Sequence, residues 1–317
     1  MNGVLIINKP AGMTSHDVVA AVRRELRVRK AGHTGTLDPL ATGVLPVCLG
    51  EATKLMPFLA AADKEYRAVM LLGVETDTQD IEGKVTRQAP PAVAEEAIAT
   101  VLDSFQGEHE QLPPRYAALK FQGRPLYEWA RRGVEVATAA RRVNIRQIRM
   151  ECFAPPYVTF FVACTKGTYI RSICADIGQA LGCGACLAGL RRLRSGPFRL
   201  EQALPLPEVA RRAPAELIAP AEALPQIAVL AVDETLATKI RHGYQPEIAS
   251  LRGRDIPFLN PGDMVKITIN RQLVALAEVL CATWDLPFHN PHEQALRLLR
   301  VFAAEKAASP ALTTRGR

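Results

Sequence analysis

The sequence predicts an α+β protein that is divided into two domains. The chain has 317 residues, more than one typical domain holds, and 48% of them are hydrophobic, which is enough for a sizeable core. Short runs typical of buried strands and longer segments with helical periodicity occur in the same chain. These patterns agree with an α+β fold, but the arrangement of the strands follows only from a resemblance described below.

The first predicted strand covers residues 3–8, an apolar run with the sequence GVLIIN. A helix follows, with Ser15 as its N-cap and Asp17 in its first turn, where a carboxylate interacts favourably with the helix dipole. The helix is expected to run to about Arg29, because apolar residues recur at helical spacing: Val18, Val19, Val22 and Leu26. The next apolar run, residues 44–49, predicts a second buried strand.

Further elements are predicted between residues 66 and 182. Strands are expected where apolar and β-branched residues gather, at residues 66–72 and 158–165. Helices are expected at residues 93–105, 126–131 and 169–181. Pro90 and Pro91 open the first of these helices, and Gly182 ends the last.

The composition changes after residue 200. Residues 201–226 are rich in Ala and Pro, which is typical of a linker with a helical turn or two. Residues 227–303 predict a small β domain, because residues 264–280 have the pattern of a hairpin with its turn at residues 270–271. The tail, residues 304–317, is expected to be disordered.

The chain is basic, with a net charge of +7 and a pI near 9.1, which favours a polyanionic partner. Its arginines and lysines gather in four clusters. Each cluster alone fits a solvated helix face, but four of them on one basic chain favour contacts with phosphates. The clusters lie at residues 23–30, 131–132, 141–149 and 191–194.

The cysteines and histidines do not predict a metal or redox site. Seven cysteines, an odd number, are interpreted as reduced thiols. Cys183 and Cys186 form one CxxC, and His289 and His292 form one HxxH, without further ligands at a zinc spacing.

No segment of the sequence predicts a membrane span or a secretion signal. There is no run of about 18 apolar residues. The apolar stretch at residues 3–8 is short, and no basic segment precedes it. We therefore expect a cytoplasmic protein.

The segment AGHTGTLDPLATGVLPVCLG, residues 31–50, sets one carboxylate, Asp38, among glycines and threonines. It contains neither a phosphate-binding loop motif nor a nucleophile elbow. Pro39 keeps Asp38 out of the helical region, and the glycines allow close approach of a substrate. Taken alone, the segment favours a turn before a strand over a carboxylate presented to a substrate.

The same segment closely resembles the catalytic motif of the TruB family of tRNA pseudouridine synthases. Other blocks resemble that family in the same order, and together they cover most of residues 1–200. The C-terminal third resembles the family's PUA-like domain less clearly. The matching blocks are LIINKPAGMTSHDVV at 5–19, DKEYRAVMLLGVETDTQDIEGKV at 63–85, PPRYAALKFQGRPLYEWARRG at 113–133 and CTKGTYIRSICADIGQALGCGACLAGLRRLRSG at 164–196.

The resemblance implies a mixed, largely antiparallel sheet with flanking helices and a central catalytic cleft. It assigns a catalytic domain to residues 1–200, an RNA-clamping insertion to residues 111–133 and a PUA-like RNA-binding domain to residues 227–303. The implied reaction converts uridine 55 in the T-loop of tRNA into pseudouridine. Because no atom is lost and no redox change occurs, we expect no cofactor and no metal.

The resemblance also implies roles for single residues. Asp38 is the nucleophile, as carboxylates are in glycosyl chemistry, and Arg171 pairs with it and keeps it ionised. Tyr66 stacks on the uracil and helps to move the C5 proton. Without the resemblance, Arg171 fits a surface helix residue and Tyr66 a core aromatic. Five more residues contact the substrate or support the active-site loop: His33, Tyr169 and Leu190 for the substrate, and Lys9 and Pro10 for the loop.

Two alternatives remain open. A non-catalytic RNA-binding or RNA-chaperone protein would also be basic, yet it would need none of Asp38, Tyr66 and Arg171. A guide-RNA-dependent relative would modify ribosomal RNA within a protein complex. Because no feature of the sequence demands protein partners, we expect a monomer that acts on the T-stem and T-loop of tRNA without an obligate protein partner.

Overall fold

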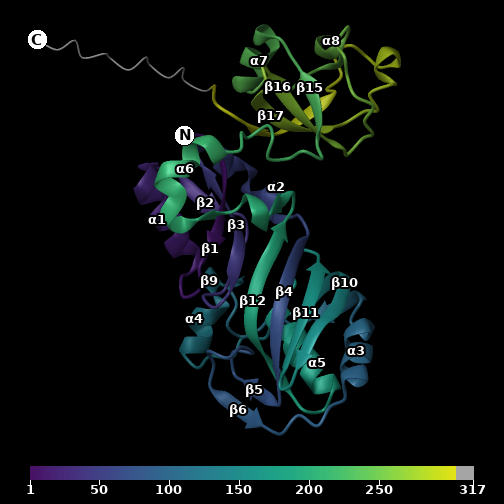
Figure 1. Ribbon diagram of the computed structural model, residues 1–317. Coiled ribbons are helices and arrows are strands. Elements are labelled where there is room, and N and C mark those ends of the chain that lie inside the picture. The colour runs from purple at the N-terminus through teal and green to yellow at the C-terminus, as the bar shows by residue number, and fades with distance from the viewer. Residues whose placement is uncertain (305–317) are drawn as a thin grey trace, which may run out of the picture. The chain divides into compact units, whose positions relative to one another are not determined.

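The computed structural model describes residues 1–304, which form two compact units (Figure 1). The first unit is Met1–Leu217, and the second begins at Ile218. Each unit has its own hydrophobic core. Apart from residue 304, the tail predicted at residues 304–317 lies outside the described residues.

The first unit is built on one mixed sheet, in the order β14-β1-β3-β12-β4-β11-β10-β7, with β2 beside β3 and β13 beside β12. Neighbouring strands are antiparallel except β1 with β14 and β3 with β12. This confirms the predicted mixed, largely antiparallel sheet. The strands are β1 (Gly3–Lys9), β2 (Ala31–His33), β3 (Thr42–Leu49), β4 (Lys64–Leu72), β7 (Gly107–Gln111), β10 (Arg141–Ala154), β11 (Tyr157–Cys164), β12 (Ala185–Ser195), β13 (Phe198–Arg199) and β14 (Leu204–Pro205).

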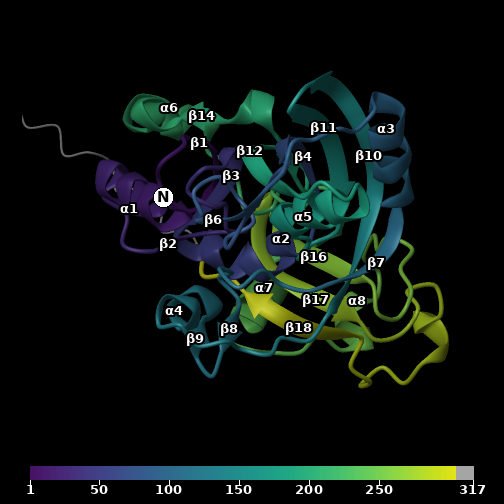
Figure 2. The same ribbon diagram turned by 90° about the horizontal axis from the view of Figure 1, so that it is seen from below.

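Helices pack on this sheet and bury its apolar side chains. Helix α5 contacts β12 and β4, and α3 lies against β10 in both ribbon views (Figure 1 and Figure 2). Helix α1 packs on α6. The helices are α1 (Ser15–Leu26), α2 (Met56–Ala60), α3 (Glu95–Ser104), α4 (Leu126–Arg131), α5 (Ile170–Ala180) and α6 (Val209–Glu216), with 3-10 turns at Gly50–Leu55, Leu200–Gln202 and Leu206–Glu208.

Helix α1 begins one residue earlier than predicted, because Thr14 rather than Ser15 is its N-cap. The Thr14 hydroxyl accepts a hydrogen bond from the backbone N–H of Asp17, and the Asp17 carboxylate accepts one from the backbone N–H of Thr14. Ser15 is buried, and its hydroxyl bonds to the backbone of Leu37 instead. The helix ends at Leu26, three residues before the predicted end, because Arg27 adopts a left-handed conformation with φ 50°.

Two of the arginine clusters lie on strands and not on helix faces. Residues 141–149 belong to β10, and residues 191–194 belong to β12; neither strand was predicted. In β10 the side chains of Val143, Ile145 and Ile148 are buried, whereas the arginines at positions 141, 142, 146 and 149 are exposed. An arginine-rich strand of this kind hides the apolar periodicity that marks most strands.

The first seventeen residues of the predicted linker, 201–217, are folded into the first unit. Strand β14 pairs in parallel with β1, and α6 buries Val209 and Ala213 against the core. The boundary between the two units therefore falls inside the stretch 201–226 that was interpreted as a linker.

The segment predicted as an insertion, residues 111–133, contains a small hairpin followed by α4. The hairpin pairs β8 (Lys120–Phe121) with β9 (Arg124–Pro125), and the Phe121 ring meets Trp129 of α4 edge-on. A second small sheet pairs β5 (Val74–Thr76) with β6 (Val85–Gln88). The predicted helix at residues 126–131 is confirmed.

The second unit is a four-stranded sheet in the order β15-β16-β17-β18 with two helices. The predicted hairpin is confirmed: its turn lies at residues 270–271, whose positive φ values of 47° and 63° suit the twist of a tight hairpin. The elements are β15 (Ala228–Ala231), α7 (Glu234–Arg241), α8 (Ile248–Leu251), β16 (Met264–Ile269), β17 (Gln272–Val279), a 3-10 turn at Leu286–Phe288 and β18 (Leu296–Val301).

Across residues 1–304, none of the helices has the length and the hydrophobicity that crossing a membrane requires.

Candidate active site

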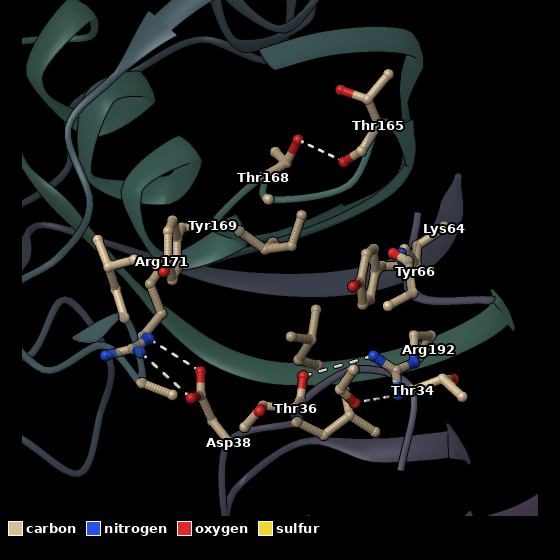
Figure 3. A pocket seen from close by; sticks show the side chains of 18 residues that line it. Thr34, Thr36, Asp38, Lys64, Tyr66, Thr165, Thr168, Tyr169, Arg171 and Arg192 are labelled. Atoms are coloured by element: carbon tan, nitrogen blue, oxygen red, sulfur yellow. Dashed lines mark hydrogen bonds and ion pairs between the residues drawn. The ribbon is translucent and has the colours of Figure 1, made fainter. Parts of the chain in front are cut away.

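The first unit contains a cavity of about 330 Å³ into which Asp38 points (Figure 3). Its walls come from the loop between β2 and β3, from strands β4 and β12, and from the β11–α5 connection. Ala118 and Leu119 of the insertion close another side. Segments that are far apart in the sequence therefore meet around one carboxylate.

Asp38 and Arg171 form an ion pair at the cavity wall. Arg171 Nε lies 2.9 Å from Asp38 Oδ2, and Arg171 Nη2 donates a hydrogen bond of 3.2 Å to Oδ1. The two side chains thus meet side-on, so that each carboxylate oxygen faces one guanidinium nitrogen. Arg171 is buried, whereas the Asp38 side chain remains 32% exposed, so an incoming substrate can reach the carboxylate.

The guanidinium of Arg171 is held from three further sides. Nη1 donates to the backbone oxygen of Thr78 at 3.1 Å, and Nη2 donates to that of Tyr116 at 2.9 Å. Asp80, which is buried, places Oδ2 3.8 Å from Nη1. The sequence interpretation missed Asp80; the only signal was its place in the polar turn TDTQD.

The charge on Asp38 depends on Arg171. Loss of solvent raises the pKa of Asp38, the positive charge of Arg171 opposes this rise, and the negative charge of Asp80 adds to it. Arg171 is the group that opposes the rise most, through its charge and its hydrogen bond, and the charge of Lys9 opposes it as well.

Lys9 ties down the loop that carries Asp38. Its ammonium donates to the backbone oxygens of Pro39 at 3.1 Å, Ala41 at 2.6 Å and Pro10 at 2.9 Å. Burial lowers the pKa of Lys9 to about 8, and the negative charge of Asp38 partly opposes this. Pro10 itself is exposed and contributes its carbonyl. Both residues therefore lie where support of the loop was expected.

Ser15 holds the same loop from the other side. Its hydroxyl accepts from the backbone N–H of Leu37 at 2.8 Å and donates to the backbone oxygen of Leu37 at 3.1 Å. These two bonds fix the residue directly before Asp38 and join it to the start of α1.

Replacing Ser15 with Ala is expected to lower the free energy of unfolding by about 1–3 kcal/mol, because a buried N–H loses its acceptor. Denaturant unfolding measures this loss. The matched control is Ser104→Ala, since that hydroxyl is exposed and bonds only within its own helix. A Ser15→Ala variant as stable as this control would mean that water replaces the lost hydroxyl.

Tyr66, Tyr169 and Leu190 line the cavity with Asp38 and Arg171. Burial raises the pKa of Tyr66, and the positive charge of Arg192 opposes the rise. Burial also raises the pKa of Tyr169. Both phenols are therefore neutral near pH 7.

His33 was expected to contact the substrate, but it is not among the residues that line the cavity. Its Nδ1 accepts a hydrogen bond of 3.3 Å from the backbone N–H of Gly35, and its ring meets that of His16 edge-on. Burial, followed by the charges of His16 and Arg192, lowers the pKa of His33 to about 4. In this structure it is a neutral ring that shapes the Asp38 loop.

Two buried cations in the cavity wall, Lys64 and Arg192, were missed as site residues. Arg192 was counted only as one member of a basic cluster. Its strand lies so close to β3 that a Cβ on Gly43 would come within 2.2 Å of the Arg192 backbone oxygen. Gly43, with φ +98°, is therefore required at that crossing.

The cysteine and histidine motifs do not form a metal site. In the part of the chain that the structure describes, no group of three or more His, Cys, Asp or Glu side chains is placed to hold a metal ion. Cys183 and Cys186 are buried thiols. His289 faces Asp285 and Glu293, and His292 faces Glu247.

Two consecutive segments of the chain match family models. Residues 23–170 match the model described as TruB family pseudouridylate synthase (N terminal domain), and residues 171–227 match that of the tRNA pseudouridylate synthase B C-terminal domain. A relative from Syntrophus aciditrophicus, named tRNA pseudouridine synthase B, is 52% identical over 95% of this chain and 99% of its own length.

The chain belongs to the TruB family of pseudouridylate synthases.

Other relatives agree with this TruB assignment. The tRNA pseudouridine synthase B of Geobacter sulfurreducens is 42% identical over 95% of this chain and 100% of its own. Among solved structures, a chain of a Cbf5-Nop10-Gar1 complex is 29% identical with a TM-score of 0.73, and covers 95% of this chain and 85% of its own. As a TruB-family protein, this chain is an enzyme of the isomerase class.

Proposed function

We propose that this enzyme converts uridine 55 in the T-loop of tRNA into pseudouridine, with Asp38 as the nucleophile. The observation that carries the proposal is the partly exposed Asp38 carboxylate paired with Arg171 in a cavity that Tyr66 also lines. The curated relatives named tRNA pseudouridine synthase B support tRNA as the substrate. Such a substrate is met in the cytoplasm, where we expect the enzyme to act.

The reaction needs only groups of this kind. The bond between N1 of uracil and C1′ of the ribose breaks, the base turns, and C5 bonds to C1′; C5 then loses its proton and N1 takes one up, so that no atom is gained or lost. A carboxylate oxygen of Asp38 can form the transient bond either to C1′ or to C6 of the base. Tyr66 would stack on the base and help to move the C5 proton, and Tyr169 and Leu190 would enclose it.

The uridine must leave the folded T-loop before it can reach Asp38. Flipping a nucleotide out of its stack costs a few kcal/mol, which stacking in the pocket and contacts with phosphates offset. The insertion at residues 111–133 supplies cavity-lining residues and carries several cations, so we propose that it clamps the RNA.

A direct assay tests the function. The purified protein is incubated with an unmodified tRNA transcript, and pseudouridine is mapped along the RNA. We expect one modified position, residue 55, and no product from a transcript in which that uridine is replaced by cytidine. Pseudouridine at another position, or none at all, would overturn the proposal.

The two alternatives are less well supported. A non-catalytic RNA-binding protein has no need to bring Asp38, Tyr66 and Arg171 to one cavity. The guide-dependent alternative is less well supported because the solved structures titled as Cbf5 or H/ACA complexes share 27–29% identity with this chain, below the 42% and 52% of two relatives named tRNA pseudouridine synthase B. We therefore propose a monomer that needs no protein partner.

We propose that the second unit is a PUA-like module that binds tRNA mainly through phosphates. Ending the chain at Leu217 should weaken tRNA binding and lower the salt slope by about one unit per lost phosphate contact. Turnover at saturating tRNA should change little, because the cavity lies in the first unit. Full affinity and full salt dependence in a soluble truncation would exclude this role.

A further inference from the structure

One end of the cavity carries two buried cations. Lys64 and Tyr66 come from β4, and Arg192 lies opposite Tyr66 on the neighbouring strand β12. All three line the same cavity as Asp38. Figure 3 shows Lys64, Tyr66 and Arg192 on one side of the pocket and the Asp38–Arg171 pair on the other.

The cations are held by backbone oxygens. The Lys64 ammonium donates to Ala60 O at 2.6 Å and to Ala62 O at 2.5 Å, which uses two of its three N–H groups. The Arg192 guanidinium uses three of its five N–H groups on backbone oxygens: Val44 O at 2.7 Å, Gly35 O at 3.0 Å and Thr36 O at 3.5 Å. Within residues 1–304 neither side chain forms an ion pair with a carboxylate.

Burying two positive charges side by side without a carboxylate partner costs free energy, because both lose their hydration and they repel each other. Arg192 is 1% exposed and Lys64 is 6% exposed. The pKa of Lys64 falls to about 8, first because of burial and next because of the charge of Arg192. A group that brings negative charge to this end of the cavity would relieve that cost. One N–H of Lys64 and two of Arg192 are not used by backbone oxygens, and the Tyr66 hydroxyl also interacts with Arg192.

Building on the proposed function, we infer that Lys64 and Arg192 bind the carbonyl oxygens of the flipped uracil and stabilise the negative charge that the ring acquires during the reaction. In the sugar route, Asp38 bonds to C1′ and the electron pair of the N1–C1′ bond stays on the uracil. In the base route, Asp38 bonds to C6 and the electron pair of the C5–C6 double bond moves toward O4. Both routes transfer one negative charge from the carboxylate to the ring, so both need a cationic environment there.

The test combines neutral variants with two substrates. Lys64→Met and Arg192→Gln are compared with Lys84→Met and Arg191→Gln, which remove the same charges from exposed positions. Dissociation constants and single-turnover rates are measured on tRNA that carries uridine or 5-fluorouridine at the modified position. The rate is followed as the disappearance of the starting nucleoside, whose base is bonded through N1. Fluorine withdraws electrons and stabilises the ring anion by itself.

We expect Lys64→Met and Arg192→Gln each to lower the single-turnover rate about 100-fold on the uridine tRNA and about tenfold or less on the 5-fluorouridine tRNA. The affinity for tRNA should be nearly unchanged. Equal slowing of both substrates would overturn the inference. So would a defect limited to tRNA affinity and its salt dependence, which would assign the cations to a backbone phosphate. The wild-type rate on uridine tests the proposed function; only the ratios of variant to wild type test this inference.

A charge-retaining variant keeps the inference testable if the neutral variants do not fold. Because the pKa of Lys64 is about 8, raising the pH through 8 removes its charge, and the wild-type rate should fall. In Lys64→Arg the side chain stays charged above pH 8, so the rate should fall less. Superimposable pH–rate profiles of the wild type and Lys64→Arg would contradict the inference. Lys9, with a similar pKa, affects both proteins equally. The other titratable groups that act on Lys64 are also common to both: Arg192, Cys164, Asp63 and Lys166.

Discussion

Replacing Asp38 with Asn is expected to lower the single-turnover rate of pseudouridine formation by about 10⁴-fold or more, because the amide keeps the shape of the side chain but is not a nucleophile. The amide oxygen can still accept the hydrogen bond from Arg171, which also keeps its contacts to Thr78, Tyr116 and Asp80. The loop should therefore stay in place and tRNA affinity should change little.

Single-turnover kinetics and equilibrium binding on the same tRNA separate the two effects. Asp103→Asn is a suitable control, because Asp103 is an exposed carboxylate on α3, away from the cavity. Turnover near the wild-type rate in Asp38→Asn would mean that another group attacks the substrate.

Replacing Arg171 with Lys is expected to reduce the single-turnover rate about 100-fold, with a modest loss of affinity. An ammonium cannot face both oxygens of Asp38 and also reach the backbone oxygens of Thr78 and Tyr116. With fewer contacts from the cation beside it, the pKa of Asp38 should rise further, since Arg171 opposes the effect of burial more than any other group does. The proposed nucleophile must be ionised to attack, so the acid limb of the pH–rate profile should move to higher pH.

The informative readout is the pH profile of the rate at saturating tRNA. Arg191→Lys is the matched control, because Arg191 is exposed on β12. An unchanged rate with a defect only in tRNA affinity would place Arg171 on the RNA backbone.

Local patterns predicted the elements that have a strong signal of their own. The hairpin of the second unit follows from two apolar runs around residues 270–271, and α4 and β4 were placed near their true bounds. The N-cap of α1 was predicted one residue too late, because two residues with hydroxyl groups, Thr14 and Ser15, are adjacent. Only the folded structure shows that the Ser15 hydroxyl bonds to the loop that carries Asp38. Strands β10 and β12 were missed because their arginines interrupt the apolar pattern.

The active-site pair could not be derived from spacing, because 133 residues separate Asp38 from Arg171. The resemblance supplied that pairing, and the geometry now gives it a physical basis. Lys64 and Arg192 were not predicted as site residues for a different reason. Their hydrogen-bond partners are backbone oxygens, which every residue has, so no sequence pattern indicates them.

The pairing of β1 with β14 has a consequence for synthesis of the protein on the ribosome. Ile7 aligns with Leu204, so one edge of β1 stays open while roughly 200 residues are translated, about 10–40 s at ordinary elongation rates. An open strand edge can pair with other nascent chains. A product that stops just before Leu204 would contain every residue of the cavity, yet the edge of β1 at Ile7 and Asn8, which β14 pairs with in the complete unit, would stay open.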